Sequence, residues 1–290
     1  MCTFEFLLAP FIASLILTGI HAYLGVHVVE RGVIFVDLSL AQIAALGTTV
    51  AVLYGIEPHS VPAYIVSLIF TFIGAAVFST IRGHKARIPQ EAIIGICYAV
   101  ASAAAILAMS KSVQETEHLK EMLVGNILTV SWFEVAKTAA LYGAIGLFHY
   151  TFRSKFLAIS VDHEKAEASG INVRFWDFLF YASFGFVVTS SVAIAGVLLV
   201  FCYLIVPSVA AMLYAEKIGT RLAIGWTMGT LVSAVGVYLS LQIDLPTGAT
   251  IVCTFALVLI LMAALRPFIR KRAAKPEAAI GAATVSERSF

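Results

Sequence analysis

Apolar residues in this chain fall into long runs that are separated by short polar stretches. Nine runs of about 20 residues can be drawn, and this is the length of α-helix that crosses roughly 30 Å of hydrocarbon. They lie near residues 4–27, 33–54, 60–81, 91–110, 131–152, 175–195, 197–215, 222–243 and 249–268. The pattern predicts an all-α integral membrane protein with about nine transmembrane helices. If the turn at Ala195-Gly196 is only a bend in one longer helix, the count is eight.

The distribution of positive charge favours nine crossings and predicts an orientation. With nine spans and the N-terminus outside, sixteen of the 19 Lys and Arg residues fall on cytoplasmic connections or on the C-terminal tail, as the positive-inside rule requires. Eight spans would move Lys217 and Arg221 to the wrong side. No basic residue precedes Arg31, so the first segment lacks the positive start of a cleavable signal peptide and is expected to remain a membrane helix. The C-terminus is then cytoplasmic.

The composition agrees with a chain that is embedded in lipid. Hydrophobic residues make up 60%, charged residues make up 12%, and the mean hydropathy is +0.95, whereas soluble domains are about 25% charged. We expect one transmembrane domain over residues 1–272 and a mobile cytoplasmic tail over 273–290, where apolar periodicity is too short to bury a face. The net charge of +2 gives no reason to expect nucleic acid as a partner.

Signatures of catalysis are absent from the sequence. There is no G-x-x-x-x-G-K-[ST] loop to cradle phosphates, and neither H-E-x-x-H nor G-x-S-x-G occurs. The four cysteines lie in apolar stretches without a C-x-x-C pair, which argues against a zinc knuckle or a disulfide framework. The chain is therefore expected to be non-catalytic, and any ATP must be bound and hydrolysed by a separate subunit.

The longest polar interruption on the predicted cytoplasmic side is residues 153–174, which contain "VDHEKAEASGINV". Acidic and small residues that end at a glycine resemble the coupling segment of ABC permeases, a short helix that docks in a cleft of the ATPase subunit. On this resemblance the ATPase-coupling residues are Glu164, Ala166, Ala168, Gly170 and Ile171. The alternative reading is a solvated loop with helical character.

Four further stretches occur in the order expected for one family of transporters. They are "ERGVIFVDLSLAQIAALG" at 30–47, "VGNILTVSW" at 124–132, "GVLLVFCYLIVPSVAAML" from Gly196, and "DLPTG" at 244–248. Together they resemble the permeases of the zinc, manganese and iron ABC importer family and cover most of the chain.

The resemblance implies a type II ABC importer-like permease in a prokaryotic plasma (inner) membrane. Such a permease works as a homodimer with a central path at its two-fold axis, served by ABC ATPase subunits and by an extracytoplasmic metal-binding protein. The chain would hold no resident cofactor, because the divalent metal ion is its cargo and ATP belongs to the partner. The resemblance does not choose among zinc, manganese and iron.

The second predicted helix departs from the family pattern, which reads roughly Gly-Asp-Ala-Leu-Ser-His followed five residues later by Gly. When Leu40 and Gly47 are aligned with it, Gln42 stands at the histidine, Leu38 at the aspartate and Asp37 at the glycine. One residue turns a side chain by about 100°, so Asp37 is turned away from the family position. A local irregularity could restore it to the path; otherwise the metal has lost a family ligand here. Asp37 and Gln42 are candidate ligands of the translocated ion; the alternatives are an interfacial acid at a helix start and a helix–helix hydrogen bond.

Asp244 is the candidate carboxylate at the outer mouth, because it ends the eighth predicted span in the stretch that matches the family residue for residue. Its alternative is a turn acid before Pro246. His21 and His27 could bind a borderline metal through neutral imidazole or could serve helix packing. Acidic residues and His118 in the outer loop 111–126 could attract cations or meet the delivery protein, or form a solvated turn.

Two other functions stay open at this point. A permease for a metal chelate or a cofactor would have the same architecture with a wide and largely apolar path. An ATP-independent secondary transporter would need no ATPase, but it would be expected to carry ionisable residues in mid-span relays, and few are present here.

Overall fold

The computed structural model describes the backbone of residues 2–57, 60–81, 89–110 and 127–286, and side chains of these stretches between Leu8 and Pro267. The described part of the chain consists of helices and their connections. The helices are α1 (Cys2–Arg31), α2 (Val36–Leu53), α3 (Val61–Ile81), α4 (Gln90–Met109), η1 (Ile127–Thr129), α6 (Trp132–Thr151), α7 (Arg153–Val161), α8 (His163–Ala168), α9 (Val173–Tyr214), α10 (Ile218–Ile243) and α11 (Thr247–Ser286). Each apolar run expected from the sequence coincides with one of the long helices or, in α9, with half of one.

Within the described residues, seven helices are long and apolar enough to cross a membrane: α1, α2, α3, α4, α9, α10 and α11. The helix α6 has 20 residues but is less apolar. The helix α9 has 42 residues, which at 1.5 Å per residue corresponds to about 63 Å, roughly twice the thickness of the hydrocarbon core. An all-helical membrane protein is therefore confirmed, whereas nine crossings remain a prediction.

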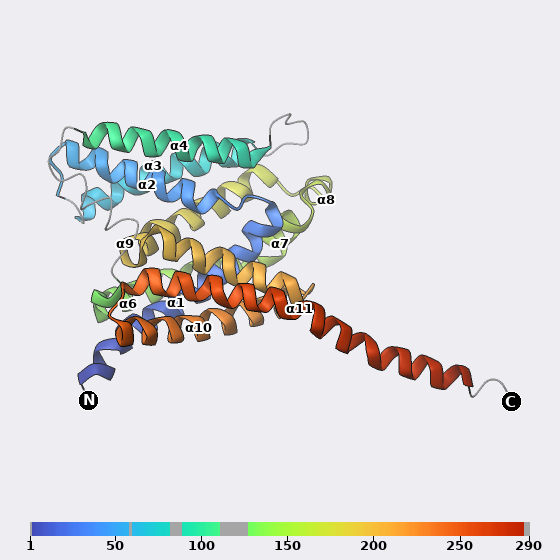
Figure 1. Ribbon diagram of the computed structural model, residues 1–290. Helices are drawn as coiled ribbons and strands as arrows, with labels where there is room; N and C mark the ends of the chain where they lie inside the picture. The colour runs from blue at the N-terminus through green and yellow to red at the C-terminus, as the bar shows by residue number, and fades with distance from the viewer. Residues whose placement is uncertain (1, 58–59, 82–88, 111–126, 287–290) are drawn as a thin grey trace.

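The backbone of α9 changes direction at Gly196, as the Ala195-Gly196 turn predicts. Gly196 has φ +76° and ψ 159°, a conformation that favours glycine because a Cβ would clash with the backbone. The two halves of α9 therefore do not form one straight rod, and the ribbon folds back at this point (Figure 1). Both halves are rich in fully buried side chains, such as Tyr181 and Tyr203.

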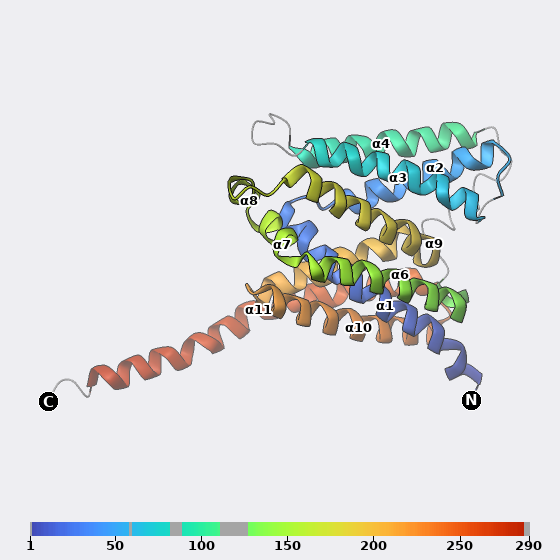
Figure 2. The same cartoon turned by 180° about the vertical axis from the view of Figure 1, so that it is seen from behind.

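Figures 1 and 2 show how the helices are grouped. One side of the bundle consists of α2, α3 and α4, the opposite side contains α1, α6, α10 and α11, and α9 packs against both groups. The end of α1 lies with α7 and α8 at one end of the bundle, which we call the α7–α8 end, and the N-terminus lies at the other. The helix α11 continues past the bundle at the α7–α8 end (Figure 1); the mobility expected for residues 273–290 stays a prediction.

Small residues allow the helices to approach closely. A Cβ added at Gly47 of α2 would lie 2.8 Å from the Ser67 Cα and 3.0 Å from the Phe70 Cβ of α3. The G-x-x-x-G pair of α10 serves contacts within the chain, since Gly229 packs on Thr18 of α1 and Gly225 lies near Ala22. These glycines are structural.

Candidate functional site

The short helix α8 is built by local capping. Asp162 ends α7 and caps α8, where its Oδ1 accepts a hydrogen bond of 3.0 Å from the Lys165 backbone N–H. The Lys165 ammonium lies 2.8 Å from Oδ2 of the same carboxylate. The hydrogen bonds from the Lys165 side chain and then from its backbone N–H lower the pKa of Asp162, and the Asp162 carboxylate raises the pKa of Lys165. The cap is therefore an anion at the positive end of a helix.

Gly170 ends α8 and sets the direction of the chain that follows. Its φ is +86°, its N–H donates to the Glu167 carbonyl over 2.9 Å, and the Ile171 N–H donates to the Ala166 carbonyl over 3.1 Å. These bonds from two residues beyond the helix satisfy carbonyls that the helix leaves open. Asn172 then caps α9 by accepting from the Phe175 N–H over 3.1 Å. Short local signals thus define the segment 162–175.

The predicted coupling residues divide between two faces of this segment. Glu164, Ala168 and Gly170 are exposed, Ile171 is half-buried, and Ala166 is only 3% exposed. Two large apolar side chains on either side of α8 in the sequence are also exposed, Val161 at 65% and Phe175 at 52%. Ala166 therefore lies on the buried side of α8 and packs against the rest of the chain.

A buried polar cluster lies beneath α7 and was not foreseen from the sequence. Nη1 of Arg31 donates to Oδ1 of Asp177 over 2.6 Å, and both side chains are 0% exposed. The Arg31 guanidinium also lies 3.9 Å from the centre of the Phe180 ring. One signal was available in the sequence. Asp177 is the third residue of the apolar run 175–195, and an ionised carboxylate within a membrane span normally needs a partner.

Ser160 of α7 connects this ion pair to a histidine. Its Oγ accepts from Nε of Arg31 over 2.9 Å, lies 2.8 Å from Nδ1 of His27, and donates to the Phe156 carbonyl over 2.8 Å. Because a hydroxyl has one proton and two lone pairs, these three bonds use its full capacity when His27 carries its proton on Nδ1. The cluster therefore joins α1, α7 and α9.

The histidines considered from the sequence serve the interior of the chain. His21 is fully buried and its Nδ1 lies 2.8 Å from the Leu17 carbonyl. His27 belongs to the polar cluster. His149 of α6, which the sequence did not single out, pairs with Ser183 through Nε2 at 2.8 Å and stacks on Phe156 at 4.3 Å. These contacts match the packing alternative.

The two candidate ligands on α2 face different surroundings. The helix runs without interruption from Val36 to Leu53, so side chains five positions apart point about 140° away from one another. Asp37 is 1% exposed, and its Oδ1 has no hydrogen-bond partner among the described residues. Gln42 is half-buried. The structure places no local irregularity in α2 that would turn Asp37 toward Gln42.

Asp244 lies at the opposite end of the bundle from Asp37. It is exposed and ends α10 in the left-handed conformation, with φ +54°, and Leu245 N–H donates to the Ser240 carbonyl over 3.0 Å. The three candidates are therefore not brought together within one copy. Among the described residues no group of three or more His, Cys, Asp or Glu could hold a metal ion; the loop 111–126 with His118 lies outside them.

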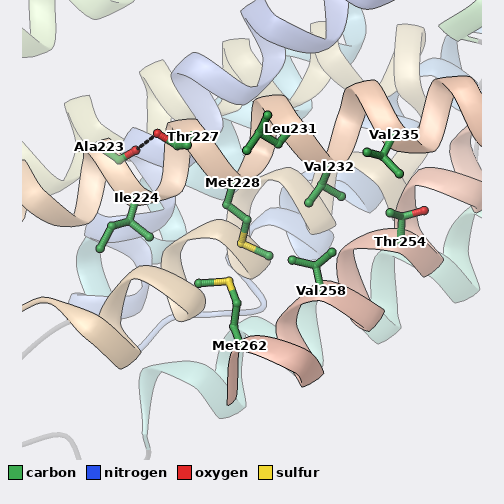
Figure 3. Close-up of a pocket in the computed structure, with 10 residues that line it drawn as sticks. All are labelled: Ala223, Ile224, Thr227, Met228, Leu231, Val232, Val235, Thr254, Val258 and Met262. Carbon is green, nitrogen blue, oxygen red and sulfur yellow. Dashed lines mark hydrogen bonds between the residues drawn. The ribbon is translucent and has the colours of Figure 1, made fainter. Parts of the chain in front are cut away.

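A groove of about 510 Å³ lies between α10 and α11 (Figure 3). Its walls are apolar, with the sulfur atoms of Met228 and Met262 directed toward one another (Figure 3). The hydroxyls of Thr227 and Thr254 donate to carbonyls of their own helices, at 2.8 and 2.7 Å. The groove therefore suits hydrocarbon rather than a bare cation.

Comparison with known proteins identifies the family. Residues 3–266 match the ABC 3 transport family. The chain is 27% identical over 241 residues to the manganese transport system membrane protein MntC of Listeria monocytogenes, which covers 79% of this chain and 83% of the relative. It is 26% identical over 249 residues to a probable iron transport system membrane protein of Haemophilus influenzae, and this alignment covers 86% of this chain and 89% of the relative.

Solved structures show the same fold. The PsaBC complex of Streptococcus pneumoniae with Fab contains a chain that superposes with a TM-score of 0.74 at 23% identity, over 89% of this chain and 90% of that chain. An inward-facing metal-chelate type ABC transporter gives a TM-score of 0.67 at 20% identity, over 88% and 85%. Since the family match covers nearly the whole chain, this protein belongs to the ABC 3 transport family, which confirms the resemblance drawn from its sequence.

Proposed function

We propose that this chain is the permease subunit of an ATP-driven importer for a divalent metal ion, with manganese and iron(II) as the leading candidates for the ion. The observation that carries the proposal is the capped segment of α7 and α8 at one end of an apolar helix bundle. It offers an exposed helix, a fixed turn at Gly170 and the apolar side chains of Val161 and Phe175 to a partner. Relatives named for manganese and iron transport supply the class of cargo.

The proposed topology has nine crossings with the N-terminus outside. It counts α6 as a span and each half of α9 as a span, and it makes the α7–α8 end cytoplasmic. The support is the charge distribution and the direction of the helices, since the ends of α1, α6 and α11 lie on the side of α7 and α8 (Figures 1 and 2). An ABC ATPase subunit would bind there, and an extracytoplasmic metal-binding protein would deliver the ion at the other end.

We place the contact between two copies of the chain at α6. The exposed side of this helix carries Ala136, Ala140 and Ala144 at intervals of four, with Gly143 beside them, and small residues in such a pattern permit close approach of another helix. The same side carries Lys137, which lies 5.8 Å from the ring of Tyr64 and would be costly against lipid. A second copy and a polar path between the copies would satisfy both features.

The ion would pass from Asp244 at the outer mouth toward Gln42 on α2. Asp37, which the regular helix turns about 140° away from Gln42, would meet the ion at a separate point nearer the α7–α8 end. Carboxylate and amide oxygens are ligands that hard divalent cations accept. Because the described residues of one copy do not gather a complete set, further ligands would have to come from the second copy or from residues outside the described part of the chain. Alternating access between the two ends requires about 5.5 kcal/mol to move a gate from 1:99 to 99:1, which binding and hydrolysis of ATP by the partner would provide.

A permease for a chelated metal or a cofactor is the second candidate. The observation that favours it is the absence of a group of three metal-ligating side chains among the described residues, together with Gln42 at the position where the family has histidine. Such a cargo brings its own ligands to the metal and needs only a wide path. The protein surface then recognises the chelator.

Uptake by vesicles distinguishes these cargoes. The chain would be reconstituted with its ATPase subunit and supplied with ATP and with free Mn²⁺, Fe²⁺, Zn²⁺ or the same ions bound to a chelator. Faster accumulation of a free ion supports the first proposal. Accumulation that occurs only with chelated metal would replace it by the second.

A further inference from the structure

The buried polar cluster joins the proposed coupling segment to the two helices that reach through the bundle. Arg31 is the last residue of α1, Ser160 belongs to α7, and Asp177 lies in the second turn of α9. The helix α8 begins directly after Asp162, which also ends α7. A displacement of α8 is therefore carried first into α7 and reaches the cluster within one turn of helix.

Two kinds of contact hold α7 in place. Rings pack around it, with Phe156 stacked on His149 at 4.3 Å and the Lys155 ammonium 4.4 Å from the Trp176 ring. The hydrophobic part of such ring contacts is non-directional. The hydrogen bonds of Ser160 to Arg31 at 2.9 Å and to His27 at 2.8 Å are directional, and they fix the position of α7 along α1.

Resting on the proposed function, we infer that Arg31, Ser160 and Asp177 are positioning residues that form a rigid joint between the coupling segment and the helices α1 and α9. ATP-driven movement of α8 passes through this joint to the gate. If the joint is loosened, the ATPase can still dock and hydrolyse ATP, but less of its movement reaches the path.

One observation separates this role from simple stabilisation of the fold. A fully buried ion pair contributes little stability relative to well-packed apolar side chains of similar volume, so stability alone gives no reason for Arg31 and Asp177 at 0% exposure.

The test compares metal moved per ATP hydrolysed, measured in vesicles with the complete transporter and with Mn²⁺ as the probe. The paired variant Arg31→Met with Asp177→Leu removes both charges and leaves no buried ion alone. Ser160→Ala changes the link to α7 by a single oxygen atom and keeps the ion pair. If the joint transmits the movement, metal moved per ATP should fall by about tenfold in the paired variant and by about threefold in Ser160→Ala, within the range by which mutations modulate coupling between sites. ATP hydrolysis should be preserved in both.

The chain offers a matched control at the same end of α1. Glu30 pairs with Arg221 of α10, and this pair, which is partly exposed, has no contact with α7 among its described hydrogen bonds. Glu30→Gln with Arg221→Met should leave metal moved per ATP unchanged. If the paired variant does not reach the membrane, Ser160→Ala decides alone. An unchanged ratio in Ser160→Ala and in every recovered Arg31 variant would overturn the joint, whereas absence of ATP-driven uptake by the wild type would instead refute the proposed function.

Discussion

Nη1 of Arg31 lies 2.6 Å from Oδ1 of Asp177, although 146 positions separate the two residues. The end of α1 is thereby held against the beginning of α9, beneath the segment formed by α7 and α8. Removing one member of the pair leaves the other charge buried without compensation.

Asp177→Leu alone is expected to destabilise the folded permease by about 3–5 kcal/mol, while the paired replacement with Arg31→Met should recover most of that loss. The measurement is the free energy of unfolding in detergent, together with the amount of protein in the membrane. If the single and the paired variants were equally unstable, an uncompensated charge would not be the cause.

Gly170→Val should uncouple ATP hydrolysis from transport. The φ of +86° at Gly170 disfavours a β-branched residue and costs about 1–3 kcal/mol locally, whereas an added Cβ would meet no atom within 4 Å. The effect therefore comes from the backbone rather than from crowding. Gly170→Asn, which tolerates this conformation, is the matched control and should couple nearly normally.

Glu164→Trp probes the same surface without changing the backbone. Glu164 is exposed on α8, so a bulky side chain should hinder docking of the ATPase while the permease stays folded. ATP hydrolysed per metal ion should rise. Normal coupling in both Glu164→Trp and Gly170→Val would remove this segment from the contact with the ATPase.

Asp244 can be tested without disturbing its turn. Its left-handed backbone, with φ +54°, is accepted by Asn more readily than by Ala. Asp244→Asn should therefore keep wild-type abundance but lower the apparent metal affinity of uptake by at least about tenfold, the smallest loss typical even when an outer-shell partner of a metal site is replaced. Wild-type affinity in Asp244→Asn would take this carboxylate off the ion path.

Asp37→Ala and Gln42→Ala should act independently. Because their side chains point about 140° apart on α2, they are not expected to bind one ion from the same copy, and their effects on the free energy of transport should add. In the paired variant, uptake should weaken only where it depends on the metal ion. An equal loss of uptake whether or not it depends on the metal ion would indicate misfolding instead.

The cap of α8 should respond to acid. The pKa of Asp162 is lowered in the folded chain, so its stabilising effect is present above its unfolded pKa and is lost as the pH falls through its folded pKa. The pKa of Lys165 is raised, so the stabilisation that Lys165 contributes to the cap is lost only as the pH rises through that higher pKa. Amide exchange in 165–170, corrected for intrinsic rates, should accelerate at acid pH, and Asp162→Asn should abolish the pH dependence.

Much of the fold could be predicted because membrane helices are governed by length and apolarity. The turn at Gly196 was also predictable, since glycine alone separates two apolar runs there. The capped segment 162–175 carries its signals locally in Asp162, Gly170 and Asn172. Each of these features depends on residues within a few positions of one another.

The remaining features depend on contacts that no local pattern contains. The position of Asp177 in an apolar run indicates that its carboxylate needs a partner for its charge, but no local pattern identifies Arg31 as that partner. The direction of Asp37 follows from one residue of register on α2, which only the folded helix settles. A path shared by two copies cannot be assembled from one chain, so the candidate ligands remain predictions.

The most direct test of the account is ATP-dependent metal uptake by vesicles that contain this chain with and without its ATPase subunit. We predict accumulation of Mn²⁺ or Fe²⁺ only when both the ATPase and hydrolysable ATP are present. Accumulation by the chain alone, driven by an ion gradient and indifferent to ATP, would contradict the central claim.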